Sequence, residues 1–114
     1  MRSPRFSPAV VDGLIALAQR FDPKIEAKCN RHYIGLMREG TVHNYAAFDP
    51  RKGPVVTCYL RLPESEIASL VEQGLDADYN ANWRRPRLRL KGDDLVTHEV
   101  LLLDLLRRAR GEEG

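Results

Sequence analysis

The stretch HYIGLMREGTVHNYAAFDPRKGPVVTCYLRL, residues 32–62, decides the fold because it holds three strand-like segments separated by turn residues. The segments are residues 32–39, 42–48 and 55–62. A glycine at position 40 separates the first two, and the sequence DPRKGP separates the last two. Proline pre-sets a turn and glycine tolerates positive φ, so both connections are expected to be short. Short connections join antiparallel neighbours, so we predict a three-stranded antiparallel meander.

The flanking sequence predicts three helices and one more strand. The first helix starts at Ser7-Pro8 and is ended by Asp22-Pro23. A short helix lies between Pro63 and Gly74. The last helix begins at Asp93 and Asp94 and runs past Leu106. The strand is RPRLRLK, residues 85–91, and the segment LDADYNANW before it reads as a polar loop. The proline at position 86 cannot donate to a ladder, so this strand lies at an edge or pairs only beyond Pro86.

These elements predict an α+β fold in the order α-β-β-β-α-β-α, with a mainly antiparallel four-stranded sheet and the helices on one face. The 114 residues are expected to form a single domain, 1–114, with loose ends at residues 1–6 and 111–114. No stretch approaches the length of a transmembrane helix, which indicates a soluble, cytoplasmic protein without a membrane partner. The two cysteines, Cys29 and Cys58, are expected to be free thiols.

Positive charge is concentrated in one segment. Residues 84–91 contain five cations and no acid, whereas the whole chain has 18 Lys and Arg against 16 Asp and Glu, a net charge of +2. Without these five charges the rest of the chain carries −3, because 2 − 5 = −3. A local basic strand of this kind is typical of a surface that binds a polyanion.

Alternation along each strand sorts the side chains onto two faces. In the strand 55–62, Cys58 and Leu60 point to the core and Tyr59 points away. Cations interleaved with aromatic rings suit single-stranded nucleic acid, because rings stack on bases and cations hold phosphates. The residues predicted to form this binding face are Tyr33, Tyr45, Tyr59, Arg61, Arg85, Arg87, Arg89 and Lys91. A different explanation stays open, since an antiparallel sheet presents polar groups to water and edge cations prevent edge-to-edge association.

No catalytic, cofactor-binding or metal-binding motif is predicted. The segment DADYNAN begins like a calcium loop, but Ala81 stands where the sharp turn needs glycine and Arg87 where a glutamate should be. His32 and His43 lack metal-pair spacing, and His98 is expected to pack on the last helix. A small enzyme using His32, His43 and Cys29 is therefore the least favoured interpretation.

The motifs HYIGLMREG, NYAAFDPRKGPVVTCYLRLPESEI and RPRLRLKGDDLV, spread over residues 24–108, resemble a bacterial domain family of unknown function, the one numbered 5655 and often labelled "predicted transport protein". The resemblance implies a module joined to nuclease-like or restriction-associated partners. It implies no catalytic residue.

Three functions are thus open. The favoured one is a non-enzymatic module that contacts nucleic acid or another polyanion through the basic, tyrosine-bearing sheet face. The alternative is a protein–protein or homodimerisation module accessory to a nuclease or restriction-type partner, and the third is the small enzyme.

Overall fold

The computed structural model describes residues 9–52 and 55–111. The predicted loose end at residues 1–6, the helix start at Ser7-Pro8 and all but the first residue of the predicted end at 111–114 lie outside these ranges. The helices are α1 (Ala9–Ala18), α2 (Glu66–Glu72), α3 (Gly92–Thr97) and α4 (Glu99–Arg110). The strands are β1 (Ile25–Cys29), β2 (Ile34–Arg38), β3 (Thr41–Val42), β4 (Ala46–Lys52), β5 (Val55–Leu60), β6 (Asp76–Asn80) and β7 (Arg85–Leu90).

The sheet contains seven strands in the described ranges, not the four that the sequence predicted. Its strand order is β1-β2-β4-β5-β7-β6, and the short β3 pairs with β2. Every pairing is antiparallel, which confirms the predicted α+β class and strand direction. The strand β7 pairs directly with β5, although α2 and β6 lie between them in the sequence.

The strands β1 and β6, which were not predicted from the sequence, form the two ends of the strand order. Most of their residues are exposed or half-buried, and only Ile25 of β1 is buried. An edge strand of this kind lacks the apolar face that makes a strand visible in a sequence. The predicted polar loop over LDADYNANW is wrong for this reason, since its centre is β6.

The second predicted strand, residues 42–48, is also corrected. The described chain forms β3 and β4 with an irregular segment between them, and Tyr45 NH bonds to the carbonyl of His43 at 2.8 Å. The strand β4 continues through Asp49–Lys52, four of the six residues of the predicted DPRKGP turn. Its register with β5 shifts between Asp49 and Lys52, so the proline at position 50 lies at an irregularity of the ladder.

Pro86 occupies an interior strand, β7, rather than an edge. On the β5 side, however, pairing begins one residue later, with Arg87 opposite Tyr59. The prediction of pairing only beyond Pro86 therefore holds toward β5 but not toward β6, where Pro86 lies opposite Tyr79 and Arg85 opposite Asn80.

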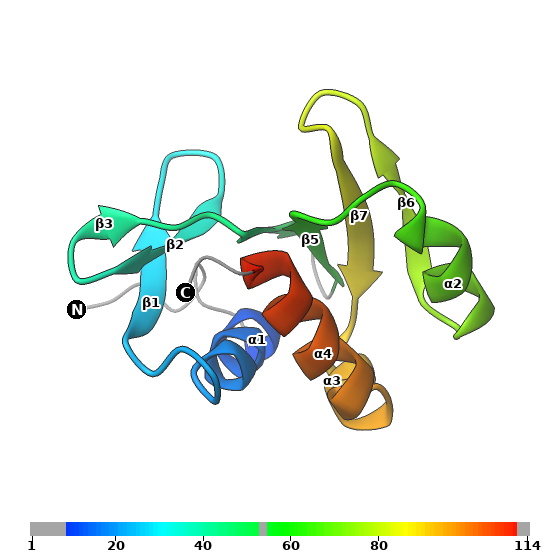
Figure 1. Cartoon of the computed structure of the whole chain (residues 1–114), viewed down its shortest axis with the longest axis horizontal. Helices are drawn as coiled ribbons and strands as arrows, with labels where there is room; N and C mark the ends of the chain where they lie inside the picture. Colours follow the sequence, from blue (N-terminus) through cyan, green and yellow to red (C-terminus); the bar gives the residue numbers. More distant parts are fainter. Residues whose placement is uncertain (1–8, 53–54, 112–114) are drawn as a thin grey trace.

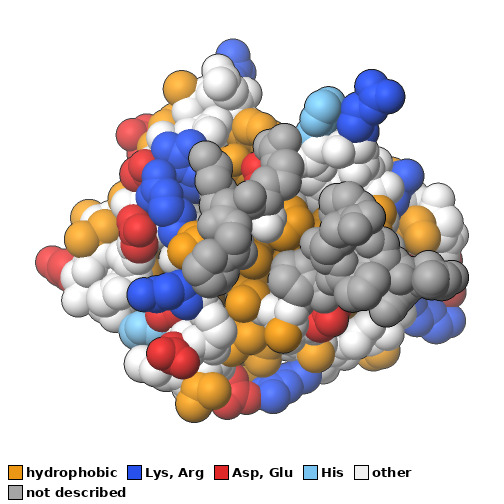
Figure 2. Space-filling view, turned by 180° about the vertical axis from the view of Figure 1, so that it is seen from behind, with side chains coloured by type: hydrophobic (Ala, Val, Ile, Leu, Met, Phe, Trp, Pro, Cys, Tyr) orange, Lys and Arg blue, Asp and Glu red, His pale blue; other side chains and the backbone are white. Residues whose placement is uncertain are grey.

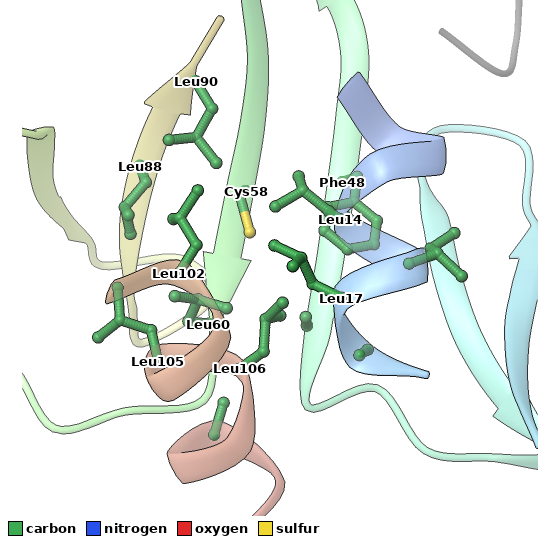
Figure 3. Close-up of a cluster of buried hydrophobic side chains, with 14 of the residues drawn as sticks. Leu14, Leu17, Phe48, Cys58, Leu60, Leu88, Leu90, Leu102, Leu105 and Leu106 are labelled. Carbon is green, nitrogen blue, oxygen red and sulfur yellow. The ribbon is translucent and has the colours of Figure 1, made fainter. Parts of the chain in front are cut away.

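The helices α1 and α4 pack against each other, and α4 also contacts β4 and β5. Both lie on the same side of the sheet, with α3 beside α4 (Figure 1). Between helices and sheet lies one apolar core, in which Leu14 and Leu17 of α1 and Leu102 and Leu106 of α4 point toward Phe48 and Cys58 (Figure 3). All six are at most 6% exposed. Among the described residues, neither α1 nor α4 covers the opposite face of the sheet, which we call the helix-free face.

The last predicted helix is two helices, since the chain breaks at His98 between α3 and α4. His98 has φ −117° and ψ 29°, outside the helical region. Asp94 accepts a hydrogen bond from the backbone N–H of Lys91 at 2.8 Å, so the predicted acidic start of this segment is correct. The break turns Val96 and Val100 outward, and both side chains are about 80% exposed (81% and 80%).

Candidate nucleic-acid interface

The predicted basic strand β7 lies beside an acidic strand. Arg87 faces Asp78 in the β6–β7 register, and Arg89 faces Asp76. Arg87 Nε donates to Asp78 Oδ1 at 2.8 Å, and Arg89 Nη2 donates to Asp78 Oδ2 at 3.0 Å. Arg89 Nη1 also donates to Asp76 Oδ1 at 3.1 Å. Two of the five cations in the basic segment are therefore already paired within the sheet.

These pairs shift the acid–base equilibrium of the carboxylate that they share. The hydrogen bond from Arg87, with a further one from Arg89, lowers the pKa of Asp78 to about 2. The acid stays charged at any ordinary pH and keeps both guanidinium groups occupied. The strand β6 could have been recognised in the sequence, because Asp76, Asp78 and Asn80 alternate with Ala77 and Tyr79, as side chains on the two faces of a strand do.

Tyr45 and Arg61, two of the predicted face residues, do not lie on the helix-free face. Tyr45 is buried at 1% exposure, and its hydroxyl donates to Asp22 Oδ2 at 3.2 Å. Arg61 donates to the carbonyls of Ala109 and Arg110, at 3.1 and 2.8 Å, so it caps the end of α4. Alternation failed because Tyr45 precedes β4 and Arg61 follows β5, where the strand geometry no longer applies.

Lys91 also lies outside the strand. It is exposed and stands at the N-terminus of α3, one residue after β7 ends. Of the predicted residues, the structure brings together Tyr33, Tyr59 and Arg85.

These three residues gather around Trp83, which the sequence analysis did not select. The rings of Trp83 and Tyr59 are stacked, with centroids 4.7 Å apart and planes 10° from parallel. Tyr33 meets the indole edge to face at 5.3 Å, and the guanidinium carbon of Arg85 lies 6.0 Å from the indole centroid. We call Tyr33, Tyr59, Trp83 and Arg85 the tip cluster. Trp83 stands in the connection that reads as a loop, and no sequence pattern related it to Tyr59.

The tip cluster lies where two hairpin connections approach each other. Residues 30–33 join β1 to β2, residues 81–84 join β6 to β7, and Tyr33 and Trp83 come from these two connections. Both connections stand at the upper end of the sheet in Figure 1. Residues 27–38 and 79–92 contain no acid. The cations Lys28, Arg31 and Arg84 in these segments have no ion pair with the described acidic residues, so their charge is open to a ligand.

Arg85 differs from the strand arginines because it has no acidic partner in the described ranges. Its Nη2 donates to the carbonyl of Asn44 at 2.7 Å, while its Nη1 is buried without a hydrogen-bond partner. Burial, together with the charge of Arg61, lowers the pKa of Arg85 from its usual value. A buried N–H without an acceptor is costly, so this guanidinium has one hydrogen bond left to give.

The centre of the helix-free face is not open to solvent. Ala47, Asp49 and Thr57, which alternation places on that face, are 0%, 8% and 8% exposed. In Figure 2, which views this side, hydrophobic side chains are visible in the parts of the middle that grey atoms do not cover, and Lys and Arg stand beside Asp and Glu toward the edge where β7 and β6 lie. A ligand along the middle of the strands, as the sequence predicted, would have little polar surface to contact. The tip cluster remains the accessible aromatic and cationic part.

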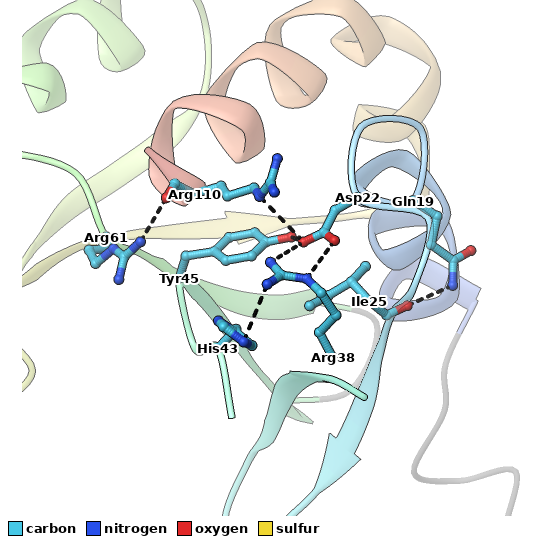
Figure 4. A network of polar contacts seen from close by, with 8 residues as sticks. All are labelled: Gln19, Asp22, Ile25, Arg38, His43, Tyr45, Arg61 and Arg110. Atoms are coloured by element: carbon cyan, nitrogen blue, oxygen red, sulfur yellow. Dashed lines mark hydrogen bonds and ion pairs between the residues drawn. The ribbon is translucent and has the colours of Figure 1, made fainter. Parts of the chain in front are cut away.

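A second polar cluster lies inside the molecule. Asp22, at 3% exposure, accepts two hydrogen bonds from Arg38, both at 2.8 Å, and lies 3.6 Å from Arg110 Nε (Figure 4). Arg38 Nη1 also lies 3.3 Å from His43 Nε2, which is the acceptor because arginine only donates. The hydrogen bonds from Arg38 lower the pKa of Asp22, while burial raises the pKa of Tyr45. This Asp22 cluster joins the end of α4 to β2 and to the turn after α1, which is a structural role.

The residues of the enzymatic alternative are not assembled. His43 contacts Arg38, whereas His32 and Cys29 are exposed near the β1–β2 connection. Cys58 is buried, which raises the pKa of its thiol to about 12. Within the described ranges, no group of three or more His, Cys, Asp or Glu side chains is arranged to hold a metal ion.

A groove of about 790 Å³ lies on the helical side, between the end of α2 and the α3–α4 segment. It is lined by Gln73, His98, Leu101, Leu103 and Arg107 among others, and by the exposed Val96 and Val100. The groove shares no lining residue with the tip cluster.

Among residues 9–52 and 55–111, no helix combines the length and apolar character that crossing a membrane requires. Comparison with family models, curated proteins and solved structures found no match for the chain. The resemblance to the family numbered 5655 therefore stays a prediction from motifs.

Proposed function

We propose that the protein is a non-enzymatic module that binds single-stranded nucleic acid through the tip cluster and the cations beside it. The observation that carries this proposal is the meeting of two acid-free hairpin connections at an aromatic cluster, beside Lys28, Arg31 and Arg84, which form no ion pair with any acid in residues 9–52 and 55–111. Aromatic rings accept any base by stacking, and cations spaced around them hold the phosphates.

The geometry favours a single strand over a duplex. In a duplex the base faces are stacked on one another and out of reach, so rings such as Tyr33 and Tyr59 can act only on unpaired bases. In the part of the chain that the structure describes, the cluster stands at two hairpin connections and carries no helix that could enter a major groove.

The strand arginines Arg87 and Arg89 have a secondary part in this proposal. Their pairs with Asp76 and Asp78 reduce the charge that they offer to phosphate. Reversing them to glutamate would also place acids opposite acids across β6 and β7, which destabilises a sheet. The cations of the two connections are therefore the better residues to test.

We expect the affinity for a fluorescein-labelled oligothymidylate to fall steeply with salt. About three to five phosphate contacts give a log–log slope of about −2 to −3.5. The double variant Arg31→Gln, Arg84→Gln should flatten the slope by about 1.4, since each lost contact with a single strand removes about 0.7. Tyr59→Ala should lower the affinity by about 1–3 kcal/mol and leave the slope nearly unchanged. Fluorescence anisotropy across a salt series measures all three quantities.

Two variants serve as matched controls. Arg107→Gln removes an exposed cation from α4, on the other side of the sheet. Tyr79→Ala removes a ring from the face of β6 opposite to Asp78. Both should bind as the wild type does. If the wild type fails to bind even at low salt, or if the controls lose as much as the test variants, the proposal is wrong.

The family resemblance adds a context to this proposal. If the chain is related to the family numbered 5655, its module would serve a nuclease-like or restriction-associated partner, and nucleic acid would be the shared ligand.

A second candidate function, homodimerisation, is favoured by the groove beside α4. Val96 and Val100 are 81% and 80% exposed at its rim, which is unusual for two valines so close in the chain. The helix α4 has Glu99 in its first turn and Arg107, Arg108 and Arg110 in its last. Two copies packed antiparallel about a two-fold axis would thus bring unlike charges together over the apolar side chains.

Under this second candidate we expect sedimentation velocity to show a dimer that Val100→Lys converts to a monomer, because the lysine would bury a charge in the interface. Val42→Lys, at a valine 51% exposed on β3, is the control and should leave the mass unchanged. A wild type that sediments as a monomer at high concentration excludes this function and leaves nucleic-acid binding in place.

A further inference from the structure

Trp83 occupies the position on Tyr59 where a base would stack. The two rings are nearly parallel, at 10°, with centroids 4.7 Å apart, and offset stacking at this separation is the arrangement that a base and an aromatic ring adopt. The indole also touches Tyr33 and lies next to the guanidinium of Arg85. Trp83 therefore contacts each of the other members of the tip cluster.

The covered arrangement leaves one polar group unsatisfied. Arg85 Nη1 is buried without a hydrogen-bond partner, although Nη2 of the same group donates to Asn44 at 2.7 Å. A nucleotide offers what this nitrogen lacks, since phosphate oxygens and base carbonyls are acceptors. A ligand that replaced the indole would stack on Tyr59 and would bring acceptor oxygens next to the Arg85 guanidinium, whose central carbon lies 6.0 Å from the indole centroid.

The surrounding chain permits the indole to move. Trp83 is 37% exposed, so one side of it already meets solvent. Its backbone N–H is held by Asn80 Oδ1 at 2.8 Å, and the next residue, Arg84, has φ 57°, a conformation that residues other than glycine seldom adopt. The hydrogen bond and the turn hold the backbone, so uncovering Tyr59 needs only a rotation of the Trp83 side chain.

We propose that Trp83 is a lid on the nucleotide site, stacked on Tyr59 in the free protein and displaced when a base takes its place beside Arg85. This inference rests on the proposed function and specifies how the same site is regulated. The lid competes with the ligand, so the free protein binds more weakly than the open site would.

Removing the lid should strengthen binding. Trp83→Ala is expected to raise the affinity for fluorescein-labelled oligothymidylate about two- to tenfold, the factor that corresponds to one aromatic stack. Trp83→Phe keeps a ring on Tyr59 and should bind within about twofold of the wild type. An unchanged or lower affinity for Trp83→Ala overturns the lid, because it would show that the indole is neutral or is itself a stacking platform.

Fluorescence of the wild type gives a second test that does not depend on the folding of a variant. Trp83 is the sole tryptophan in the chain, so all indole emission reports on this site. Adding unlabelled oligothymidylate should shift the emission to the red and increase quenching by acrylamide, as the indole leaves Tyr59 for solvent. A shift to the blue with less quenching would overturn the lid. If neither the wild type nor Trp83→Ala binds at low salt, the proposed function itself fails, and that result is distinct from binding without displacement of Trp83.

Discussion

Replacing Asp22 with alanine is expected to lower the free energy of unfolding by about 3–5 kcal/mol, because it removes a buried carboxylate that pairs with two half-buried guanidinium groups. Asp22 is 3% exposed, and the Arg38 and Arg110 side chains that approach it are 23% and 24% exposed. The hydroxyl of Tyr45 would lose its acceptor as well. Urea unfolding at neutral pH measures the loss.

The same cluster predicts a pH dependence. The hydrogen bonds from Arg38 lower the pKa of Asp22 in the folded state, so its contribution to stability is complete above the unfolded pKa of about 3.9. That contribution is lost as the pH falls through the lower folded pKa. Asp22→Asn should therefore lack this acid-dependent part of the stability, while the wild type shows it between about pH 4 and the lower folded pKa.

An exposed ion pair gives the control. Glu99→Ala removes the partner of Arg20, whose side chain is 55% exposed, and should cost less than about 1 kcal/mol. If Asp22→Ala costs no more than Glu99→Ala, the Asp22 cluster does not stabilise the fold as we infer.

Truncating Leu102 or Leu60 to alanine is expected to cost about 2–5 kcal/mol each. Leu102 of α4 is 2% exposed and Leu60 of β5 is 1% exposed, and both point into the core between helices and sheet (Figure 3). Truncation removes buried methyl groups and leaves a cavity that the surrounding helix and strands cannot fully close.

The matched control for Leu102 is Val100→Ala, two residues earlier on the same helix and 80% exposed. It should change the free energy of unfolding by less than about 0.5 kcal/mol. A loss below that value for Leu102→Ala or Leu60→Ala in the same urea series would contradict the packing described here.

The core could be predicted from the sequence because its signal is local and repeated. The apolar periodicity of α1 predicted its buried side chains, and in β5 the alternation of Cys58 and Leu60 with Tyr59 predicted that Cys58 and Leu60 are buried. Burying apolar side chains dominates the free energy of folding, so residues that repeat at the right spacing are found without knowing their partners.

The edges of the fold could not be predicted in the same way. The strands β1 and β6 have few apolar residues, and what makes them strands is the neighbour that each one pairs with. Likewise, one break in the backbone at His98 divides a leucine-rich segment that has an uninterrupted helical pattern.

The charges show the same division most clearly. In the sequence alone, the segment 84–91 is rich in cations, and the segment DADYN, residues 76–80, holds two acids, Asp76 and Asp78. Only the pairing of β6 with β7 brings Asp78 opposite Arg87 and turns two predicted phosphate ligands into partners of an internal ion pair.

By itself, then, the sequence determined the α+β class, the antiparallel strands and the side chains of the core, because hydrophobic periodicity acts along the chain. Tertiary structure alone decided which charges and rings are open to a ligand. The stack of Trp83 on Tyr59, the pairs of Arg87 and Arg89 and the burial of Tyr45 each join residues at least nine positions apart in the chain. Whether a cation or ring is available depends on what lies across the sheet from it, and the order of residues along the chain does not contain that information.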